Sequence, residues 1–299
     1  MVRYVLLVTL GACSYGVLST IVKRAYDEGF GVEQVVGSQM LFGFGIVALL
    51  AAIFARGRGG ARPGQWLPLL AVGVPIGLTG VLYYSALLYV SASLAVVLLF
   101  QFTWMGVLLE AVVDRKPPAP LRIAAVGLLL AGTALASGLL EETGGTASLR
   151  GIFLGLASAV SYTAFIYGSG RVEAQVQPWL RSLVMVGGSV LLAFVVFPPR
   201  FLVDGSLPAG LWKHGLLLAL FGPVLPTVCF NLGVPRIGPG LASILGAAEL
   251  PIAVLLSTAI LGERVGPLQW VGIAVLLVGI VLPELRLPQQ RQHRVDGSG

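Results

Sequence analysis

Glu249 is an acidic residue in the middle of an apolar run and is the first candidate for chemistry in this sequence. It stands in the stretch GAAELPIAVLL, Gly246 to Leu256, two residues before Pro251. A charged side chain at the centre of a membrane helix costs about 3 kcal/mol on insertion scales, so an intramembrane carboxyl group indicates function by default. It could carry a coupled proton or pair with the ammonium group of a solute. The structural alternative is a neutral carboxylic acid hydrogen-bonded to an adjacent helix, and Pro251 does not discriminate between these interpretations.

Aromatic and amide side chains form a second candidate set. Tyrosines and tryptophans near the ends of membrane helices commonly form interfacial belts. The aromatic members of this set lie too far from the ends of their apolar runs for that role, and each needs a polar partner or a wet cavity. Gln101 and Trp104, three residues apart, share one face of a helix. We therefore predict a solute cavity lined, together with Glu249, by Tyr15, Tyr83, Tyr84, Gln101, Trp104, Tyr162 and Asn231.

Prolines inside apolar runs are candidate hinges. The run that holds Gly73–Gly80 reads GVPIGLTG, and a later run holds Phe221–Pro226, FGPVLP. A proline within a helix frees a backbone carbonyl, which then needs a neighbour, a water or a ligand. The alternative is close packing of helices through small residues, and both interpretations can hold. The predicted hinge residues are Pro75, Pro223, Pro226 and Pro251.

The elements that must position these residues are apolar helices. Of 299 residues, 57% are hydrophobic and 11% charged, whereas a soluble domain carries about 25% charged residues. Apolar runs of about 20 residues, each long enough to span a bilayer as a helix, recur along the chain. We predict an all-α polytopic membrane protein with ten transmembrane helices. The predicted spans are about Tyr4–Val22, Val35–Ala55, Trp66–Leu87, Ala92–Val113, Leu121–Leu139, Gly151–Gly170, Trp179–Phe197, Leu211–Gly233, Pro239–Leu261 and Leu268–Leu285.

The sequence contains an internal duplication. Ser14-Tyr15 recurs as Ser161-Tyr162, and 162 − 15 = 147; the same offset pairs Pro120-Leu121 with Pro267-Leu268. Each half holds five predicted spans, an odd number, so the second half enters the membrane inverted relative to the first. Solute sites of such transporters lie near the midplane between the halves. The predicted organisation is a first five-helix repeat (1–140), a linker (141–149), a second, inverted five-helix repeat (150–285) and a cytoplasmic tail (286–299).

The orientation follows from the distribution of charge. An even number of spans puts both termini on the same side. With cytoplasmic termini, most of the 19 Lys and Arg residues face the cytoplasm, as the positive-inside rule requires. The basic pI of about 9.6 therefore needs no nucleic-acid partner. We predict a bacterial inner-membrane location with both termini cytoplasmic, in a monomer or weak dimer. Cys13 and Cys229 lie inside apolar runs and are interpreted as packing residues without a disulfide.

Two stretches resemble a known transporter superfamily. Tyr83–Leu99 (YYSALLYVSASLAVVLL) is similar to the third-to-fourth-span signature of the EamA-type drug/metabolite transporters, and Ala242–Glu263 resembles the matching stretch of their second repeat. Within that superfamily the chain most resembles the YddG-type exporters of aromatic and other amino acids. The first half departs from the pattern, with Trp104 where many members have proline. The resemblance implies a ten-span transporter with two inverted halves around a central cavity, and it implies export.

Other functional classes fit the sequence less well. No Lys or Arg falls well inside a predicted span to hold a phosphate, so the cavity suits small neutral, zwitterionic or cationic solutes. We expect no enzyme activity, metal or cofactor, since no histidine pair or G-x-S-x-G motif is present. The predicted function is export of aromatic or other neutral amino acids, or similar metabolites, by alternating access. The alternatives are an exporter of cationic or apolar drug-like solutes and a passive channel. The predicted partners are the solute, the lipid bilayer and, if Glu249 is a coupling site, protons.

Overall fold

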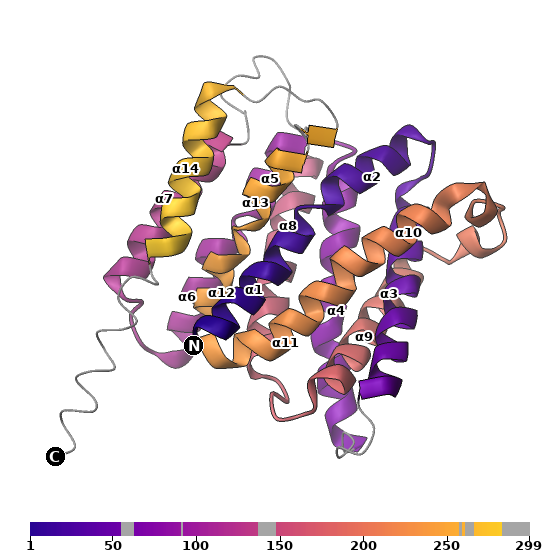
Figure 1. Ribbon diagram of the computed structural model, residues 1–299, viewed down its shortest axis with the longest axis horizontal. Helices are drawn as coiled ribbons and strands as arrows, with labels where there is room; N and C mark the ends of the chain where they lie inside the picture. The colour runs from indigo at the N-terminus through magenta and orange to yellow at the C-terminus, as the bar shows by residue number, and fades with distance from the viewer. Residues whose placement is uncertain (55–62, 91, 137–147, 257–258, 261–265, 283–299) are drawn as a thin grey trace.

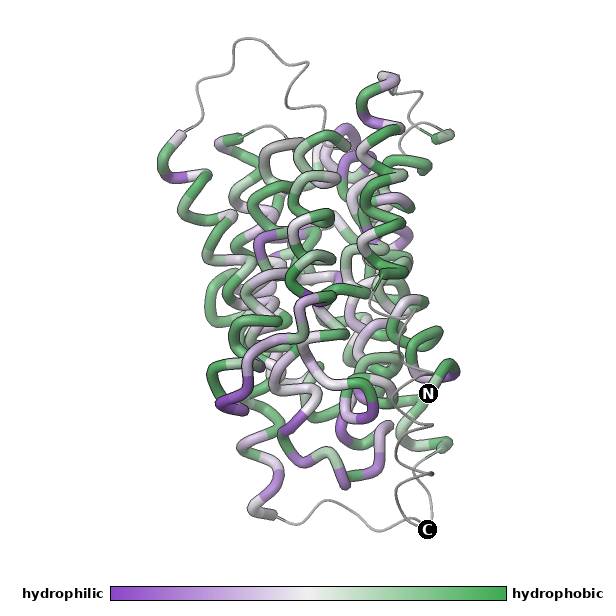
Figure 2. Tube along the Cα trace, turned by 90° about the vertical axis from the view of Figure 1, so that its left-hand side faces the viewer, coloured by the Kyte–Doolittle hydropathy of each residue, from purple (hydrophilic) through white to green (hydrophobic). Residues whose placement is uncertain are grey.

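The computed structural model describes residues 1–54, 63–90, 92–136, 148–256, 259–260 and 266–282. Within these residues the chain forms helices and turns and no β-strand (Figure 1). The predicted tail, 286–299, and nearly all of the predicted linker lie outside the described residues. Figure 2 shows hydrophobic residues predominating along the helices, with many hydrophilic residues toward the two ends of the bundle.

The helices follow one another with short connections. The first half contains α1 (Val2–Tyr15), α2 (Leu18–Asp27), α3 (Val32–Phe54), α4 (Pro63–Ala86), α5 (Ala92–Leu99), α6 (Phe102–Asp114) and α7 (Pro120–Ala136). The second half contains α8 (Leu149–Arg171), α9 (Pro178–Val196), η1 (Arg200–Leu202), η2 (Leu207–Leu211), α10 (Trp212–Ala219), η3 (Leu220–Val224), α11 (Leu225–Ile237), α12 (Pro239–Gly246), α13 (Glu249–Leu256) and α14 (Pro267–Val281). The helices α7 and α14 pack against each other at one side of the bundle (Figure 1).

Eight helical segments in the described part of the chain are long and apolar enough to cross a membrane. They are Val2–Asp27, Val32–Phe54, Gly64–Ala86, Val97–Asp114, Leu149–Arg171, Pro178–Val196, Leu207–Ile237 and Pro239–Leu256. Each corresponds to one predicted span. The other two predicted spans contain α7 and α14, apolar helices of 17 and 15 residues. The prediction of a helical polytopic protein is confirmed.

Three of the predicted spans are broken helices rather than continuous ones. The breaks fall between α1 and α2, between α5 and α6, and between α12 and α13. At each break the backbone makes short i→i+3 hydrogen bonds, such as Gly16 to Cys13, Gln101 to Leu98 and Ala247 to Ile244. The last break has a local cause, because Pro251 has no N–H to donate to the carbonyl of Ala247.

The other predicted hinge prolines behave differently from Pro251. The helix α4 continues through Pro75 without a break. Pro223 lies within η3, a π-helical segment, and Pro226 is the second residue of α11. Both prolines lie within the continuous helical segment Leu207–Ile237, so neither of them breaks the chain into separate helices.

Element boundaries recur at the offset found in the sequence. The first residues of α5 and α12 are 147 residues apart (239 − 92 = 147), and so are those of α6 and α13, α7 and α14, and α1 and α8. The breaks at Phe100 and Ala247 are separated by the same distance. The break between α5 and α6 therefore has its counterpart between α12 and α13, although Trp104 stands where the second half has Pro251.

A close backbone-to-backbone helix contact joins the two halves. Gly73 and Gly77 of α4 lie against the backbone of Met185 and Ser189 in α9. A Cβ atom at Gly77 would come within 2.6 Å of the Ser189 carbonyl oxygen, so no larger residue fits without a backbone shift. The Gly73–Gly80 stretch therefore packs closely against a neighbouring helix through its small residues, as the second of the two interpretations proposed.

Candidate functional site

The ends of several helices define one face of the bundle, which we call the N-terminal face because α1 begins there. Arg171 at the end of α8 pairs with Asp114 at the end of α6, and Arg236 at the end of α11 lies over the ring of Tyr4 near the start of α1. Gln177, just before α9, bonds the carbonyl of Phe54 at the end of α3. The far end of the bundle, where α2 ends and α3 begins, is called the opposite face.

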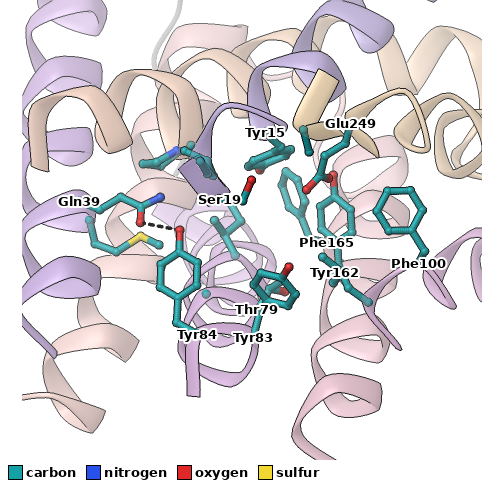
Figure 3. A pocket seen from close by; sticks show the side chains of 18 of the residues that line it. Tyr15, Ser19, Gln39, Thr79, Tyr83, Tyr84, Phe100, Tyr162, Phe165 and Glu249 are labelled. Carbon is teal, nitrogen blue, oxygen red and sulfur yellow. Dashed lines mark hydrogen bonds between the residues drawn. The ribbon is translucent and has the colours of Figure 1, made fainter. Parts of the chain in front are cut away.

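A cavity of about 90 Å³ lies in the half of the bundle toward the opposite face. Its walls come from both halves of the sequence (Figure 3). The lining residues are Tyr15, Leu18, Ser19, Gln39, Met40, Ile76, Thr79, Gly80, Tyr83, Tyr84, Leu99, Phe100, Tyr162, Phe165, Gly222, Pro223, Glu249, Leu250 and Ala253. A site for one water needs about 10–15 Å³, so several waters or part of a small solute fit here.

Five of the eight predicted solute-contacting residues line this cavity. They are Tyr15, Tyr83, Tyr84, Tyr162 and Glu249. Among the predicted hinge prolines, Pro223 lines it as well. Figure 3 shows the carboxyl group of Glu249 beside Tyr15, Tyr162 and Phe165, with Tyr83 and Tyr84 across the open space. Among the described lining residues, Glu249 is the one with a carboxyl group, and none is Lys, Arg or His.

Glu249 owes its position to the broken helix. It is the first residue of α13, where the helix dipole favours a negative charge. Gly16, at the break between α1 and α2, packs directly against this turn, and a Cβ there would lie 2.5 Å from the Glu249 carbonyl oxygen. The two breaks therefore meet beside the carboxylate.

The tyrosines at corresponding positions of the two halves touch each other. Tyr15 and Tyr162 pack edge to face, with ring centroids 5.8 Å apart and an interplanar angle of 86°. The two tyrosines, 147 positions apart in the sequence, therefore meet where the two halves of the chain are in contact. The hydroxyl of Tyr84 bonds the side-chain oxygen of Gln39 over 3.3 Å (Figure 3), so Gln39 fixes one wall of the cavity.

The serines before these tyrosines connect the halves, a role that the sequence analysis missed. Ser14 donates to the carbonyl of Phe221 over 3.0 Å, and Ser161 donates to the carbonyl of Pro75 over 3.0 Å. Each bond runs from one half to the proline-containing segment of the other. The recurrence of Ser14-Tyr15 as Ser161-Tyr162 was the available signal, but only the tyrosines were interpreted.

Gln101 and Trp104 bond to each other and do not line the cavity. The indole Nε1 of Trp104 donates to Gln101 Oε1 over 2.9 Å, and Gln101 Nε2 donates to the carbonyl of Val97. They share a helix face, as their spacing predicts. The break at Phe100 and Gln101 places the Phe100 ring, rather than the amide, in the cavity wall.

Asn231 lies buried in α11, nearer the N-terminal face, and does not line the cavity either. Its Nδ2 donates to Ser182 Oγ over 2.9 Å. Its Oδ1 has no hydrogen-bond partner among the described residues. Phe230, its neighbour, stacks on Phe165 with ring centroids 5.9 Å apart.

Arg181 is a buried basic side chain that the sequence analysis did not select, because it lies near the start of its predicted span. It is the fourth residue of α9 and is fully buried. Its guanidinium donates to the carbonyls of Ser169 and Val172 at 2.7 and 2.8 Å, and to that of Asn231 at 3.3 Å. The first two are carbonyls at the C-terminal end of α8, where a cation is favourable. Arg181 is not part of the cavity and therefore provides no anion clamp there.

Replacing Arg181 with Met should destabilise the protein by about 3 kcal/mol, because hydrogen bonds to a buried charged group are lost and three carbonyls are left without their donor. Thermal unfolding of the purified protein in detergent measures the effect. Arg200→Met, at an exposed position of η1, is the matched control and should leave the unfolding temperature unchanged. Equal unfolding temperatures of the two variants would contradict a bracing role for Arg181.

Comparison with known proteins identifies the family. The model of the EamA-like transporter family matches residues 2–138 and again residues 149–283. The chain belongs to the EamA-like transporter family. It is therefore a multi-pass membrane transporter. The two matched segments begin 147 residues apart (149 − 2 = 147).

Two uncharacterized transporters are similar to this EamA-like transporter. An uncharacterized transporter of Archaeoglobus fulgidus is 26% identical over 92% of this chain and 94% of its own length. The uncharacterized inner membrane transporter YicL of Salmonella typhimurium is 30% identical over 68% of this chain and 67% of its own. One crystal structure of a protein with 20% identity superposes with a TM-score of 0.76 over 97% of this chain and 99% of that one, which shows a shared fold.

Proposed function

We propose that this EamA-like transporter is a bacterial inner-membrane protein of ten spans arranged as two inverted five-helix repeats, 1–140 and 150–285. The recurrence of element boundaries at an offset of 147 supports this organisation, as do the two family matches and the reciprocal bonds of Ser14 and Ser161. In this proposal α7 and α14 are the fifth span of each repeat. The N-terminal face is cytoplasmic, and the cavity faces the other side of the membrane.

We propose further that the transporter exports small solutes that combine an ammonium group with an apolar or aromatic body, by alternating access. Amino acids such as phenylalanine are the first candidates. The observation that carries this proposal is the carboxylate of Glu249 among aromatic side chains in a central cavity. A carboxylate pairs with an ammonium group, and aromatic faces attract both rings and cations. The direction, export, rests on the resemblance to YddG-type exporters.

Organic cations without a carboxylate are a second candidate class. A zwitterion would place its own carboxylate in the same cavity as Glu249, and the described lining contains no Lys or Arg to receive it. Hydroxyl groups of Ser19, Thr79 and the tyrosines are the available donors. An amine that lacks a carboxylate would need no such donor in the cavity.

Flux of labelled phenylalanine into liposomes that contain the purified protein tests the function. We expect saturable flux that phenethylamine, which keeps the ammonium and ring, inhibits competitively. The anion 3-phenylpropionate, which lacks the ammonium, should inhibit at least about tenfold more weakly, since a lost charge pair of about 1.4 kcal/mol changes affinity tenfold. Saturable flux of labelled phenethylamine without phenylalanine flux would favour the second class.

Two results would contradict the proposed function. Equal inhibition by 3-phenylpropionate and phenylalanine would exclude pairing between the ammonium and the cavity. Flux that rises linearly with concentration without saturation would indicate a passive channel. Liposomes that carry a heat-inactivated sample of the same protein provide the background flux.

A further inference from the structure

The last two turns of α4 form a wall of the cavity that has a buried counterpart in the second half. Thr79, Gly80, Tyr83 and Tyr84 all line the cavity. Adding 147 to these numbers gives four residues on α11. Those residues, Pro226, Thr227, Phe230 and Asn231, are all buried, and none of them lines the cavity.

Two atoms on this face of α11 lack hydrogen-bond partners. Thr227 Oγ1 and Asn231 Oδ1 are buried without a partner among the described residues. The two residues are four positions apart and therefore lie on the same side of the helix. A buried polar atom without a partner costs about 1–3 kcal/mol. Both atoms can accept hydrogen bonds, and contact with water or a solute in another conformation would remove this cost.

A chain of packed aromatic rings links this face of α11, through Phe230, Phe165 and Tyr162, to Phe102 of α6. The ring of Phe165 stacks on Phe230, and Phe102 packs edge to face on Tyr162 with centroids 4.7 Å apart. Phe102 is fully buried and lies against Gly246 of α12. Farther toward the N-terminal face, Gly106 of α6 packs directly on Ser243 of α12. The pairing of α6 with α12 therefore closes the bundle on this side.

The same offset relates this closed side to the open one. The counterparts of α6 and α12 are α13 and α5. Both line the cavity, α13 with Glu249, Leu250 and Ala253 and α5 with Leu99. The position that Glu249 occupies on the open side is held by Phe102 on the closed side, since 249 − 102 = 147. An exchange of conformations between the two halves would thus separate α6 from α12 and bring α5 and α13 together.

We propose that Thr227, Phe230 and Asn231 form the solute-contact surface of a second cavity that opens at the N-terminal face when α6 and α12 separate. This inference rests on the alternating-access function proposed above. The solute is the same ammonium-bearing compound. In this cavity Thr227 Oγ1 and Asn231 Oδ1, both uncharged, accept its N–H groups in place of the carboxylate of Glu249. Because hydrogen bonds to neutral acceptors are weaker than those to a carboxylate, the solute binds less tightly on this side.

Accessibility of single cysteines tests the second cavity. In a background with Cys13→Ser and Cys229→Ala, we would place T227C or N231C and apply a membrane-impermeant methanethiosulfonate from either side of oriented proteoliposomes. We expect modification of T227C and N231C only from the N-terminal face, and of G80C and Y84C only from the opposite face. The control S158C, at a fully buried residue outside the cavity, should not react from either side.

A second variant separates a solute contact from a structural role. Thr227→Val keeps the shape of the side chain and removes the hydroxyl without a partner, so the unfolding temperature should stay equal or rise. Phenylalanine flux should fall about tenfold if the hydroxyl contributes about 1.4 kcal/mol to solute contact. A variant with unchanged flux would overturn the proposal.

The outcomes distinguish this inference from the proposed function. If T227C and N231C react no faster than S158C while saturable phenylalanine flux persists, the second cavity is wrong and the transport function stands. If T227C and N231C react as expected but no tested amine is transported, the surface opens as inferred and the solute class is wrong.

Discussion

Replacing Glu249 with Gln is expected to weaken the apparent affinity for ammonium-bearing solutes by about 30-fold or more, which corresponds to about 2 kcal/mol for the loss of one partner of a desolvated charge pair. Glu249 supplies the carboxyl group of the described cavity lining, and the amide keeps its size but cannot ionise. Half-saturation concentrations of phenylalanine and phenethylamine flux in liposomes measure the effect.

The response of flux to a pH gradient separates the two roles of Glu249. If its carboxyl group carries a coupled proton, an imposed gradient drives wild-type flux but not flux by the Gln variant. Glu33→Gln, which removes an exposed charge from the first turn of α3, controls for the general loss of negative charge and should transport normally. A Glu249→Gln protein that fails to fold would support the structural alternative, and a folded one with unchanged affinity would exclude solute pairing.

Replacing Gly73 with Ala is expected to destabilise the protein by about 3 kcal/mol, at the upper end for an overpacked interior. The added Cβ would overlap the carbonyl group of Met185, so α4 and α9 would have to separate along their contact. Alanine is the better helix former by about 1 kcal/mol, so helix propensity alone would stabilise the Gly73→Ala protein. A loss of stability would therefore identify the tight contact with α9 as its cause. Thermal unfolding in detergent and the yield of monodisperse protein measure the change.

Gly45→Ala is the matched control for Gly73→Ala. Gly45 lies within α3, is exposed, and has nothing within 4 Å of the added atom. At this position the added methyl group meets no other atom, so the higher helix propensity of alanine should raise the unfolding temperature. If both substitutions moved the unfolding temperature in the same direction, the contact between α4 and α9 would not be the tight interface described above.

Those parts of the fold that depend on local sequence could be predicted. The lengths of the apolar runs indicated the helices, and the recurrence of Ser14-Tyr15 at 147 residues matched the recurrence of element boundaries. The break before Pro251 also has a local cause. The breaks at Gly16 and Phe100 have no proline beside them, and their positions depend on contacts with other helices that hydropathy does not record.

The residues of the candidate site could be predicted where position deep in an apolar run was enough to identify them. Glu249 and the four tyrosines were selected for their depth in the predicted spans, and all five line the cavity. Gln101 and Trp104 have the same depth, but they satisfy each other within one helix turn. Arg181 was missed because its partners are carbonyls of two other helices, and sequence position near a helix start suggested an exposed residue.

The glycine contact between α4 and α9 also has a consequence for how the chain is made. During synthesis, α4 is made before α9, so Gly73 and Gly77 lack the α9 backbone on which they pack until the second half is inserted. The first half of the chain supplied alone would keep this groove uncovered, and we expect it to be degraded faster by membrane proteases than the full chain. Supplied together as two separate polypeptides, the halves would complete the interface by assembly, and the connection 137–147 would then not be needed to hold them in register.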